Sequence, residues 1–192
     1  MERTAGWICP PGLCESSALI LRFVNTRPSP NGRVEGLADQ AGLANWLADA
    51  GLGEGASEVG YADVVAAREL RSAFETILRA HAGCVDDPAS VPAAEAYLQR
   101  IAERHPLTPR LTADGCTFVP SQSGVPGAFG ALFAASADLA ARGGWSRLKV
   151  CKNPSCHAGF FDKTRNSSGL YCGATCGSQM SMRAYRSRLK TA

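Results

Sequence analysis

The chain is poor in the residues and segments that catalysis, secretion and membrane insertion require. Its three histidines, His81, His105 and His157, are scattered along 192 residues, and the sequence has no nucleophile motif or phosphate-binding loop. Near the start, Pro10 and Pro11 stand where a secretory signal peptide would carry an apolar run. No stretch reaches the roughly 20 apolar residues of a membrane-spanning helix. We therefore expect a cytoplasmic protein that is not an enzyme and does not enter a membrane.

Thiols stay reduced in the cytoplasm, so clustered cysteines indicate a metal site and not disulfides. Among eight cysteines, Cys151 and Cys156 are separated by four residues, Cys172 and Cys176 by three, and fifteen residues lie between the two pairs. Two short-spaced pairs with an insert of this length are typical of a tetrahedral zinc site. Four thiolates complete the shell of the metal. The sequence therefore predicts one structural Zn²⁺ bound by Cys151, Cys156, Cys172 and Cys176.

The residues around these cysteines predict a treble-clef-like finger. Phe160-Phe161-Asp162 is expected to form a strand, residues 165–169 a turn, and Leu170-Tyr171 the returning strand. Cys172 and Cys176 are four residues apart, so on a helix they would lie on one face and bind the same ion from its first turn. So small a unit has little apolar area, and the metal must supply much of its stability.

The rest of the chain predicts an α-rich N-terminal domain, so the fold class is mainly α (α+β). Apolar residues recur at helical spacing in four segments, and a Gly or Pro follows each segment. An Asp-Gly turn between two short extended segments predicts a hairpin over residues 110–119, while Leu19–Val24 fits either a strand or a helix. The helices are expected over residues 37–50, 59–82, 90–105 and 129–142, and Gly143-Gly144 divides the chain into domains 1–143 and 144–192.

The net charge of +3 conceals an uneven distribution. Residues 142–192 contain ten basic residues and one acidic residue, a formal charge of +9, which leaves −6 for residues 1–141. A basic terminal module on an acidic body is typical of a protein that binds a polyanion with one part. A helix beginning at Cys176 would place Arg183, Arg186 and Lys190 on one side, suited to phosphates. The alternative is a solvated helix end, where cations are favoured by the helix dipole.

The same helix would carry Met182, Tyr185 and Leu189 together on the neighbouring face. We expect this apolar face to pack on the finger or on the helical body.

At this point the chain resembles a known bacterial family, in which an ABATE domain precedes a CGNR-type zinc finger and whose members are described as stress-induced transcription regulators. Residues 160–166, Phe-Phe-Asp-Lys-Thr-Arg-Asn, resemble the finger of that family, as do Cys172, Cys176 and Gly177. Upstream, Phe23-Val24-Asn25-Thr26 resembles the family signature Asp-Phe-x-Asn-Thr, although Arg22 replaces the acid. Residues 43–47 and 68–71 resemble its helices.

The eponymous motif is only half kept, since Ser178-Gln179 follows Gly177 where the family has Asn-Arg. The resemblance implies a transcription regulator whose finger binds DNA and whose N-terminal domain senses a small-molecule effector or mediates assembly, such as a homodimer. The loss of Asn-Arg favours an alternative, in which the finger is an adaptor for protein or RNA. The expected nucleic-acid contacts are Lys163, Arg165, Arg183, Arg186, Arg188 and Lys190, mostly to phosphate.

Asn25, Thr26 and Arg71 have two interpretations. They could form a polar cluster in a ligand cleft between the modules, where an amide and an arginine fork fix an anionic effector. They could instead cap helices and form surface pairs.

Overall fold

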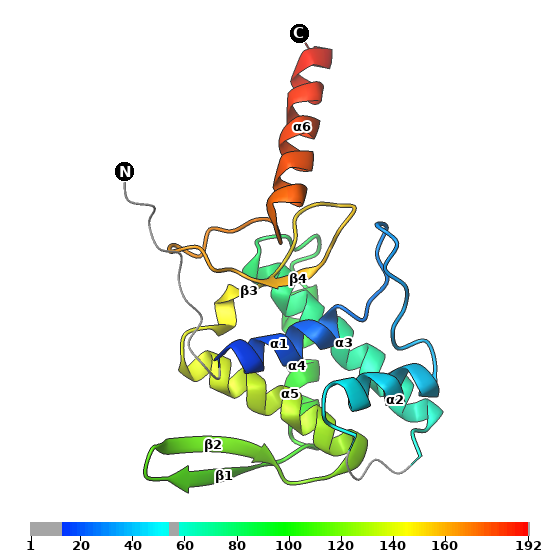
Figure 1. Cartoon of the computed structure of the whole chain (residues 1–192), viewed down its shortest axis with the longest axis vertical. Coiled ribbons are helices and arrows are strands. Elements are labelled where there is room, and N and C mark those ends of the chain that lie inside the picture. Colours follow the sequence, from blue (N-terminus) through cyan, green and yellow to red (C-terminus); the bar gives the residue numbers. More distant parts are fainter. Residues whose placement is uncertain (1–12, 54–57, 192) are drawn as a thin grey trace.

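The computed structural model describes residues 13–53 and 58–191 (Figure 1). Helices dominate the body, one hairpin interrupts them, and the cysteine module follows, ending in a long helix that projects away from the body. The elements of the body are α1 (Leu13–Val24), α2 (Gln40–Asp49), α3 (Tyr61–His81), α4 (Ser90–Ala102), β1 (Leu107–Thr112), β2 (Gly115–Pro120) and α5 (Gly124–Ala141). Those of the module are the short 3₁₀ helix η1 (Trp145–Arg147), β3 (Leu148–Val150), β4 (Gly159–Phe161) and α6 (Ala174–Thr191). The mainly helical fold class is confirmed.

The ends of the helices follow from local chemistry. The carboxylate of Asp39 accepts a hydrogen bond from the Gly42 amide at 2.8 Å, which caps the first turn of α2. Just beyond the ends of α3 and α5, Gly83 and Gly143 adopt φ of +63° and +69°, a left-handed conformation that side chains disfavour. The predicted helix stops at these two glycines are confirmed.

The segment for which the sequence left strand and helix open is the C-terminal half of α1. Ile20, Phe23 and Val24 are buried and recur at helical spacing, so one face of α1 enters the core. The Phe23 ring packs 5.0 Å from that of Trp46 on α2 and 6.3 Å from that of Phe74 on α3, measured between centroids. Aromatic packing thus ties α1 to two other helices.

The hairpin lies where the sequence placed it and is slightly longer. β1 and β2 pair antiparallel, with Thr112 opposite Gly115 across the turn. β2 packs against α5, and Figure 1 shows the hairpin at the opposite end of the molecule from α6.

α5 is long and apolar enough, by length and composition, to cross a membrane, and it is the one helix of this kind in the described parts of the chain. It lies in the core, however. Leu132 and Leu139 are fully buried, and α1 and β2 pack on it. The apolar composition of α5 is therefore that of a core helix.

The core of the body continues into the cysteine module. β3 packs against α3, and its residues Leu148 and Val150 belong to the same buried cluster as Leu70 and Leu132. Burying each such aliphatic side chain contributes on the order of 1.5 to 3 kcal/mol. The first strand of the module is therefore held by the body.

The expected strand pairing inside the finger was wrong. β4 pairs antiparallel with β3, which precedes Cys151, and not with Leu170-Tyr171. Leu148 and Val150 bring a buried apolar face to the pair, whereas Leu170 is 46% exposed. The returning segment is attached instead by a hydrogen bond from the Lys152 amide to the Leu170 carbonyl, at 2.9 Å.

Candidate metal centre and nucleic-acid interface

The four predicted cysteine ligands converge. Their Sγ atoms all lie within 4.8 Å of one another, and the sulfurs of Cys156 and Cys172, and of Cys172 and Cys176, are each 3.7 Å apart. Four thiolates at about 2.3 Å from a zinc ion form a tetrahedron with edges of about 3.8 Å. A disulfide would require about 2.05 Å between two sulfurs. The spacing fits a tetrahedral zinc ion.

Three backbone elements position these sulfurs. Cys151 directly follows β3, and Cys156 ends a tight turn in which its amide donates to the Asn153 carbonyl at 2.9 Å. The second pair differs from the expected arrangement. Cys172 precedes α6, which begins at Ala174, so only Cys176 lies on the first turn of the helix. The two sulfurs still meet because the chain bends into the helix between them.

The burial of the thiols shows why the site needs a cation. Cys151 is 1% exposed and Cys156 is 5% exposed. Burial raises the pKa of the Cys151 thiol, because a low-dielectric surrounding disfavours the thiolate. A divalent zinc ion reverses this penalty by binding the thiolates directly. With four sulfurs around it the ion has no open position, so it is structural.

Asn153 is a buried residue of the site that the sequence reasoning missed. Its side-chain oxygen accepts from the Ser155 amide at 3.1 Å, which shapes the turn between the first two ligands. Its amide group donates to Oε1 of Gln179 at 2.8 Å. Gln179 stands in the half of the CGNR motif that this chain does not keep. It therefore has a structural part here, attaching α6 to the first cysteine turn.

The loop after β4 is built around the buried carboxylate of Asp162, which is 1% exposed. Lys149 Nζ donates to it at 2.7 Å, the Gly169 amide at 2.7 Å, and Thr164 through both its amide and its hydroxyl, at 2.9 and 2.7 Å. A Cβ added at Gly169 would lie 2.7 Å from the carboxylate, so only glycine fits there. One acidic side chain thus organises residues 162–169.

The hydrogen bonds to Asp162 also set its ionisation. Burial alone would raise the pKa of this carboxyl, but donors from Lys149, Thr164 and Gly169 outweigh burial and lower the pKa to about 2. A lowered folded-state pKa stabilises the protein above the ordinary value of 3.8. We therefore expect the contribution of Asp162 to be complete above that pH and to be lost as the pH falls toward 2.

Asn25 connects the finger to the body. Its side-chain amide forms two hydrogen bonds with the backbone of Gly159 on β4, donating to the carbonyl at 3.0 Å and accepting from the amide at 2.8 Å. A Cβ at Gly159 would lie 3.1 Å from Leu21 Cδ2, so α1 and β4 are in close contact. Asn25, immediately after α1, therefore makes the donated and the accepted hydrogen bond to β4 that the backbone of a neighbouring strand would make.

Thr26 follows Asn25 in the sequence, and Arg71 of α3 contacts Thr26. Both residues also have partners within the protein. Arg71 is 6% exposed and donates to both carboxylate oxygens of Glu35, at 2.5 and 2.8 Å, and to the Thr26 hydroxyl at 3.0 Å. This bidentate ion pair fixes the loop between α1 and α2 onto α3. These contacts give the three residues structural partners within the protein, and the cavity between α1, β2 and α5 is lined by other residues.

Replacing Asn25 with alanine is expected to lower the free energy of unfolding of the zinc-loaded chain by about 2 kcal/mol, because two partly buried backbone groups of Gly159 lose their partner. Denaturant titration checks this value. Asn166→Ala, at an exposed asparagine of the same finger, is the matched control and should change it by less than about 0.5 kcal/mol. Equal effects of the two substitutions would contradict the contact.

The predicted nucleic-acid contacts lie on two neighbouring parts of the module. Arg183, Arg186 and Arg188 are exposed on α6, which leaves the module away from the body (Figure 1), and the helix contains no acidic residue. Lys163 and Arg165 are exposed on the loop organised by Asp162. The side chain of Lys190 lies outside the described residues. Arg147 fixes this loop, since its guanidinium donates to the carbonyls of Asp162 and Thr164 at 3.0 and 2.7 Å.

The apolar face of α6 does not pack as expected. Met182, Tyr185 and Leu189 are 52%, 51% and 61% exposed, because the helix extends beyond the finger after its first turns. The helix therefore presents both cations and an apolar stripe to solvent.

Two family models match the chain and agree with these features. The ABATE model, described as a putative stress-induced transcription regulator, matches residues 17–143, and the CGNR zinc finger model matches residues 147–189. No curated protein matches the chain. The second model covers all four cysteines and most of α6. The chain thus belongs to the ABATE family and ends in a CGNR zinc finger.

Proposed function

We propose that the protein is a cytoplasmic transcription regulator that binds DNA through the zinc finger and α6. In this proposal residues 144–192 contact DNA and residues 1–143 sense a ligand or mediate assembly. In this proposal the zinc ion is structural and not catalytic, because four thiolates fill its coordination shell and leave no position for a substrate.

The placement of α6 carries the proposal. The helix is fixed at its start by Cys176 in the metal cluster and by Gln179 bonded to Asn153, while its exposed arginines extend beyond the finger. A rigidly anchored helix with cations and no carboxylate is suited to lie along DNA phosphates. Lys163 and Arg165, on the loop beside its base, add charge of the same sign.

The exposed apolar stripe of α6 favours the second candidate function. Three large side chains at helical spacing, flanked by arginines, are typical of helices that bind another protein. In this alternative the finger is an adaptor for protein or RNA. Competition of unlabelled duplex DNA, single-stranded DNA and RNA for one labelled duplex separates the two functions. The regulator requires duplex DNA to compete best.

Replacing Arg183 or Arg186 with alanine is expected to weaken binding to all duplex sequences alike. Each substitution should lower the slope of log affinity against log salt by about one unit, because one phosphate contact is lost. Fluorescence anisotropy of a labelled duplex over a salt series measures the slope.

The matched control is Arg110→Ala, which removes the same charge from the hairpin at the opposite end of the molecule. An unchanged slope in the Arg183 and Arg186 variants, or an equal loss in the control, would remove α6 from the interface.

A further inference from the structure

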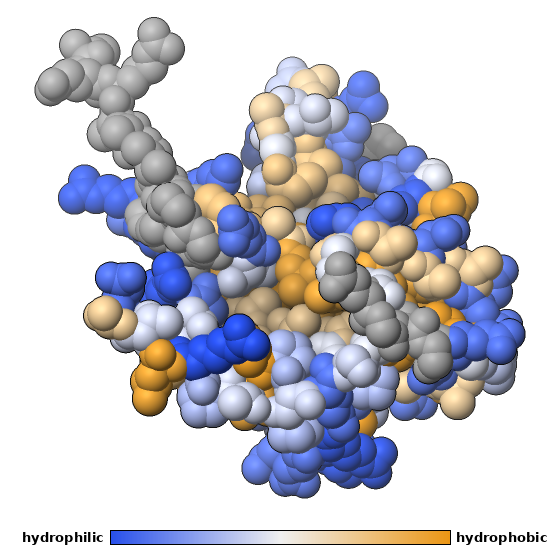
Figure 2. All heavy atoms as spheres, turned by 60° about the horizontal axis from the view of Figure 1, so that its bottom comes forward, coloured by the Kyte–Doolittle hydropathy of each residue, from blue (hydrophilic) through white to orange (hydrophobic). Residues whose placement is uncertain are grey.

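A cavity of about 710 Å³ lies between α1, β2 and α5, within the range of roughly 300 to 1,000 Å³ that small-molecule sites occupy. Much of its wall is apolar, with Ala134 and Ala137 of α5 facing Leu19 of α1, and Phe118 of β2, which is 48% exposed, beside them. Figure 2 shows a hollow with a hydrophobic floor and a largely hydrophilic rim on the face where these elements meet. The zinc site and the predicted DNA contacts lie elsewhere.

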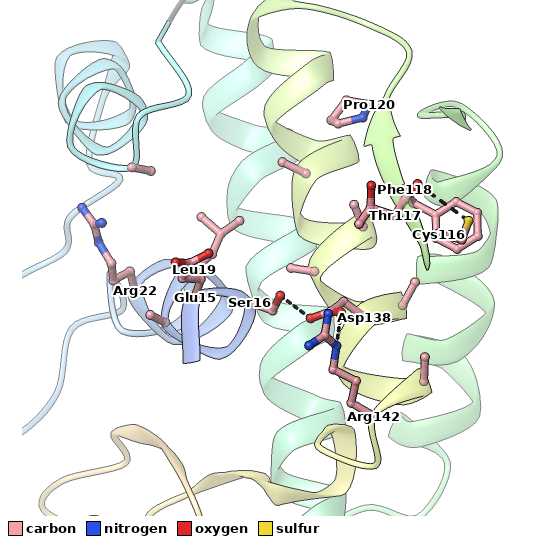
Figure 3. Close-up of a pocket in the computed structure, with 17 residues that line it drawn as sticks. Glu15, Ser16, Leu19, Arg22, Cys116, Thr117, Phe118, Pro120, Asp138 and Arg142 are labelled. Atoms are coloured by element: carbon pink, nitrogen blue, oxygen red, sulfur yellow. Dashed lines mark hydrogen bonds and ion pairs between the residues drawn. The ribbon is translucent and has the colours of Figure 1, made fainter. Parts of the chain in front are cut away.

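One fixed carboxylate enters this apolar wall. Oδ2 of Asp138 accepts from the Ser16 hydroxyl at 2.7 Å, and its Oδ1 accepts from Nε of Arg142 at 2.6 Å (Figure 3). The first contact joins α1 to α5, and the two contacts together hold the carboxylate in one orientation. A carboxylate has about four acceptor positions, so Asp138 can accept further hydrogen bonds from a ligand.

The charges around the cavity favour a ligand that donates hydrogen bonds. Both lining cations are engaged, since Arg142 pairs with Asp138 and Arg22 donates to the Asp49 carbonyl at the end of α2. Glu15, also in the lining, has no partner among the residues that the structure describes. Two carboxylates with unused acceptor capacity beside an apolar wall complement an organic amine with an apolar body.

α1 connects this cavity to the finger. Ser16 and Leu19 line the cavity, Leu21 lies against Gly159, and the next residue after the helix, Asn25, pairs with the backbone of β4. A ligand that moves α1 relative to α5 therefore acts directly on the strand that precedes the second cysteine pair.

We infer that this cavity is a binding site for a small amphipathic amine, and that its occupation is transmitted through α1 to the finger. The proposed binding site depends only on the cavity, whereas an effect of the ligand on DNA binding rests on the proposed function.

The test compares three molecules with the same apolar body: 4-phenylbutylamine, 4-phenylbutanol and 4-phenylbutyric acid. Calorimetry with the zinc-loaded full chain should give saturable binding of the amine, with the alcohol and the acid about tenfold weaker or more. Asp138→Asn should reduce the affinity for the amine to that for the alcohol. No saturable binding of the amine, or equal affinity for amine and acid, would overturn the site.

A second pair of variants distinguishes the cavity from other surfaces. Ala134→Phe, at a half-buried wall position, should abolish binding, while Ala140→Phe, at an exposed position on the same helix, should preserve it. Thermal unfolding of both variants reports their folding. Unchanged amine binding in a folded Ala134→Phe variant would place the ligand elsewhere.

The effect of ligand binding on the finger is measured in ¹H–¹⁵N spectra. Saturating amine should shift the signals of the Asn25 side-chain amide and of the Gly159 backbone amide, and unmoved signals would overturn the transmission. Repeating the amine titration while duplex binding is measured then tests whether the amine regulates DNA binding. A protein that binds the amine but no duplex would refute the proposed function and leave the amine site standing.

Discussion

Replacing Cys151 with serine is expected to unfold the finger and to abolish stoichiometric zinc binding. Cys151 is buried, directly follows β3 and supplies one of the four clustered sulfurs, so its loss removes a ligand of the metal. Structural zinc ions contribute about 10 to 16 kcal/mol of apparent binding free energy in isolated fingers. Removing a group that only hydrogen-bonds to a metal ligand lowers metal affinity by up to roughly 100-fold. Removing the ligand itself should lower the affinity for zinc by more than that. Metal content and amide spectra of the purified variant provide the measurement.

Cys116→Ser and Cys84→Ser are the matched controls, because these thiols are free and lie outside the cluster. Both should keep one zinc ion per chain. The signals of α2 and of the hairpin should persist in Cys151→Ser, since the core of the body does not include the metal. A fully folded finger in the metal-free variant would contradict a structural role for zinc.

Replacing Lys149 with methionine is expected to lower the free energy of unfolding by about 3 to 5 kcal/mol, because the Asp162 carboxylate then remains buried without its cation. Both side chains of this pair are almost fully buried, at 7% and 1% exposure. Denaturant titration in saturating zinc measures the change. Lys163→Met, one residue after Asp162 and exposed, should change it by less than about 0.5 kcal/mol.

A double-mutant cycle isolates the pair. Combining Lys149→Met with Asp162→Asn should cost less than the sum of the two single changes, because no uncompensated charge remains buried. Additive costs would show that the two side chains act independently, which would refute the role of the ion pair in organising the loop.

The zinc ligands and most helices could be predicted because their signals are local. The two cysteine pairs and their insert identify the metal site by spacing alone, and apolar periodicity with Gly83 and Gly143 identifies the helices and their ends. The hairpin is local for the same reason. Each of these features depends on residues that are close together along the chain.

The missed features depend on contacts between distant residues. β3 is only three residues long, too short for a recognisable alternation, so the pairing of β4 was assigned to the wrong segment. Asn25 and Gly159 are 134 positions apart, and nothing in the sequence connects them. Lys149 resembles any other cation of the basic module until Asp162 is found beside it. The exposed stripe of α6 follows from where the helix points, which periodicity does not specify.

In the proposed function, one zinc ion holds α6 in the position from which its arginines bind DNA. Zinc titration of the metal-free full chain, followed by anisotropy of a labelled duplex selected from a random pool, tests it most directly. We expect no specific binding without metal and a rise in binding that saturates at one zinc ion per chain. Equal binding of the duplex before and after the metal is added would contradict it.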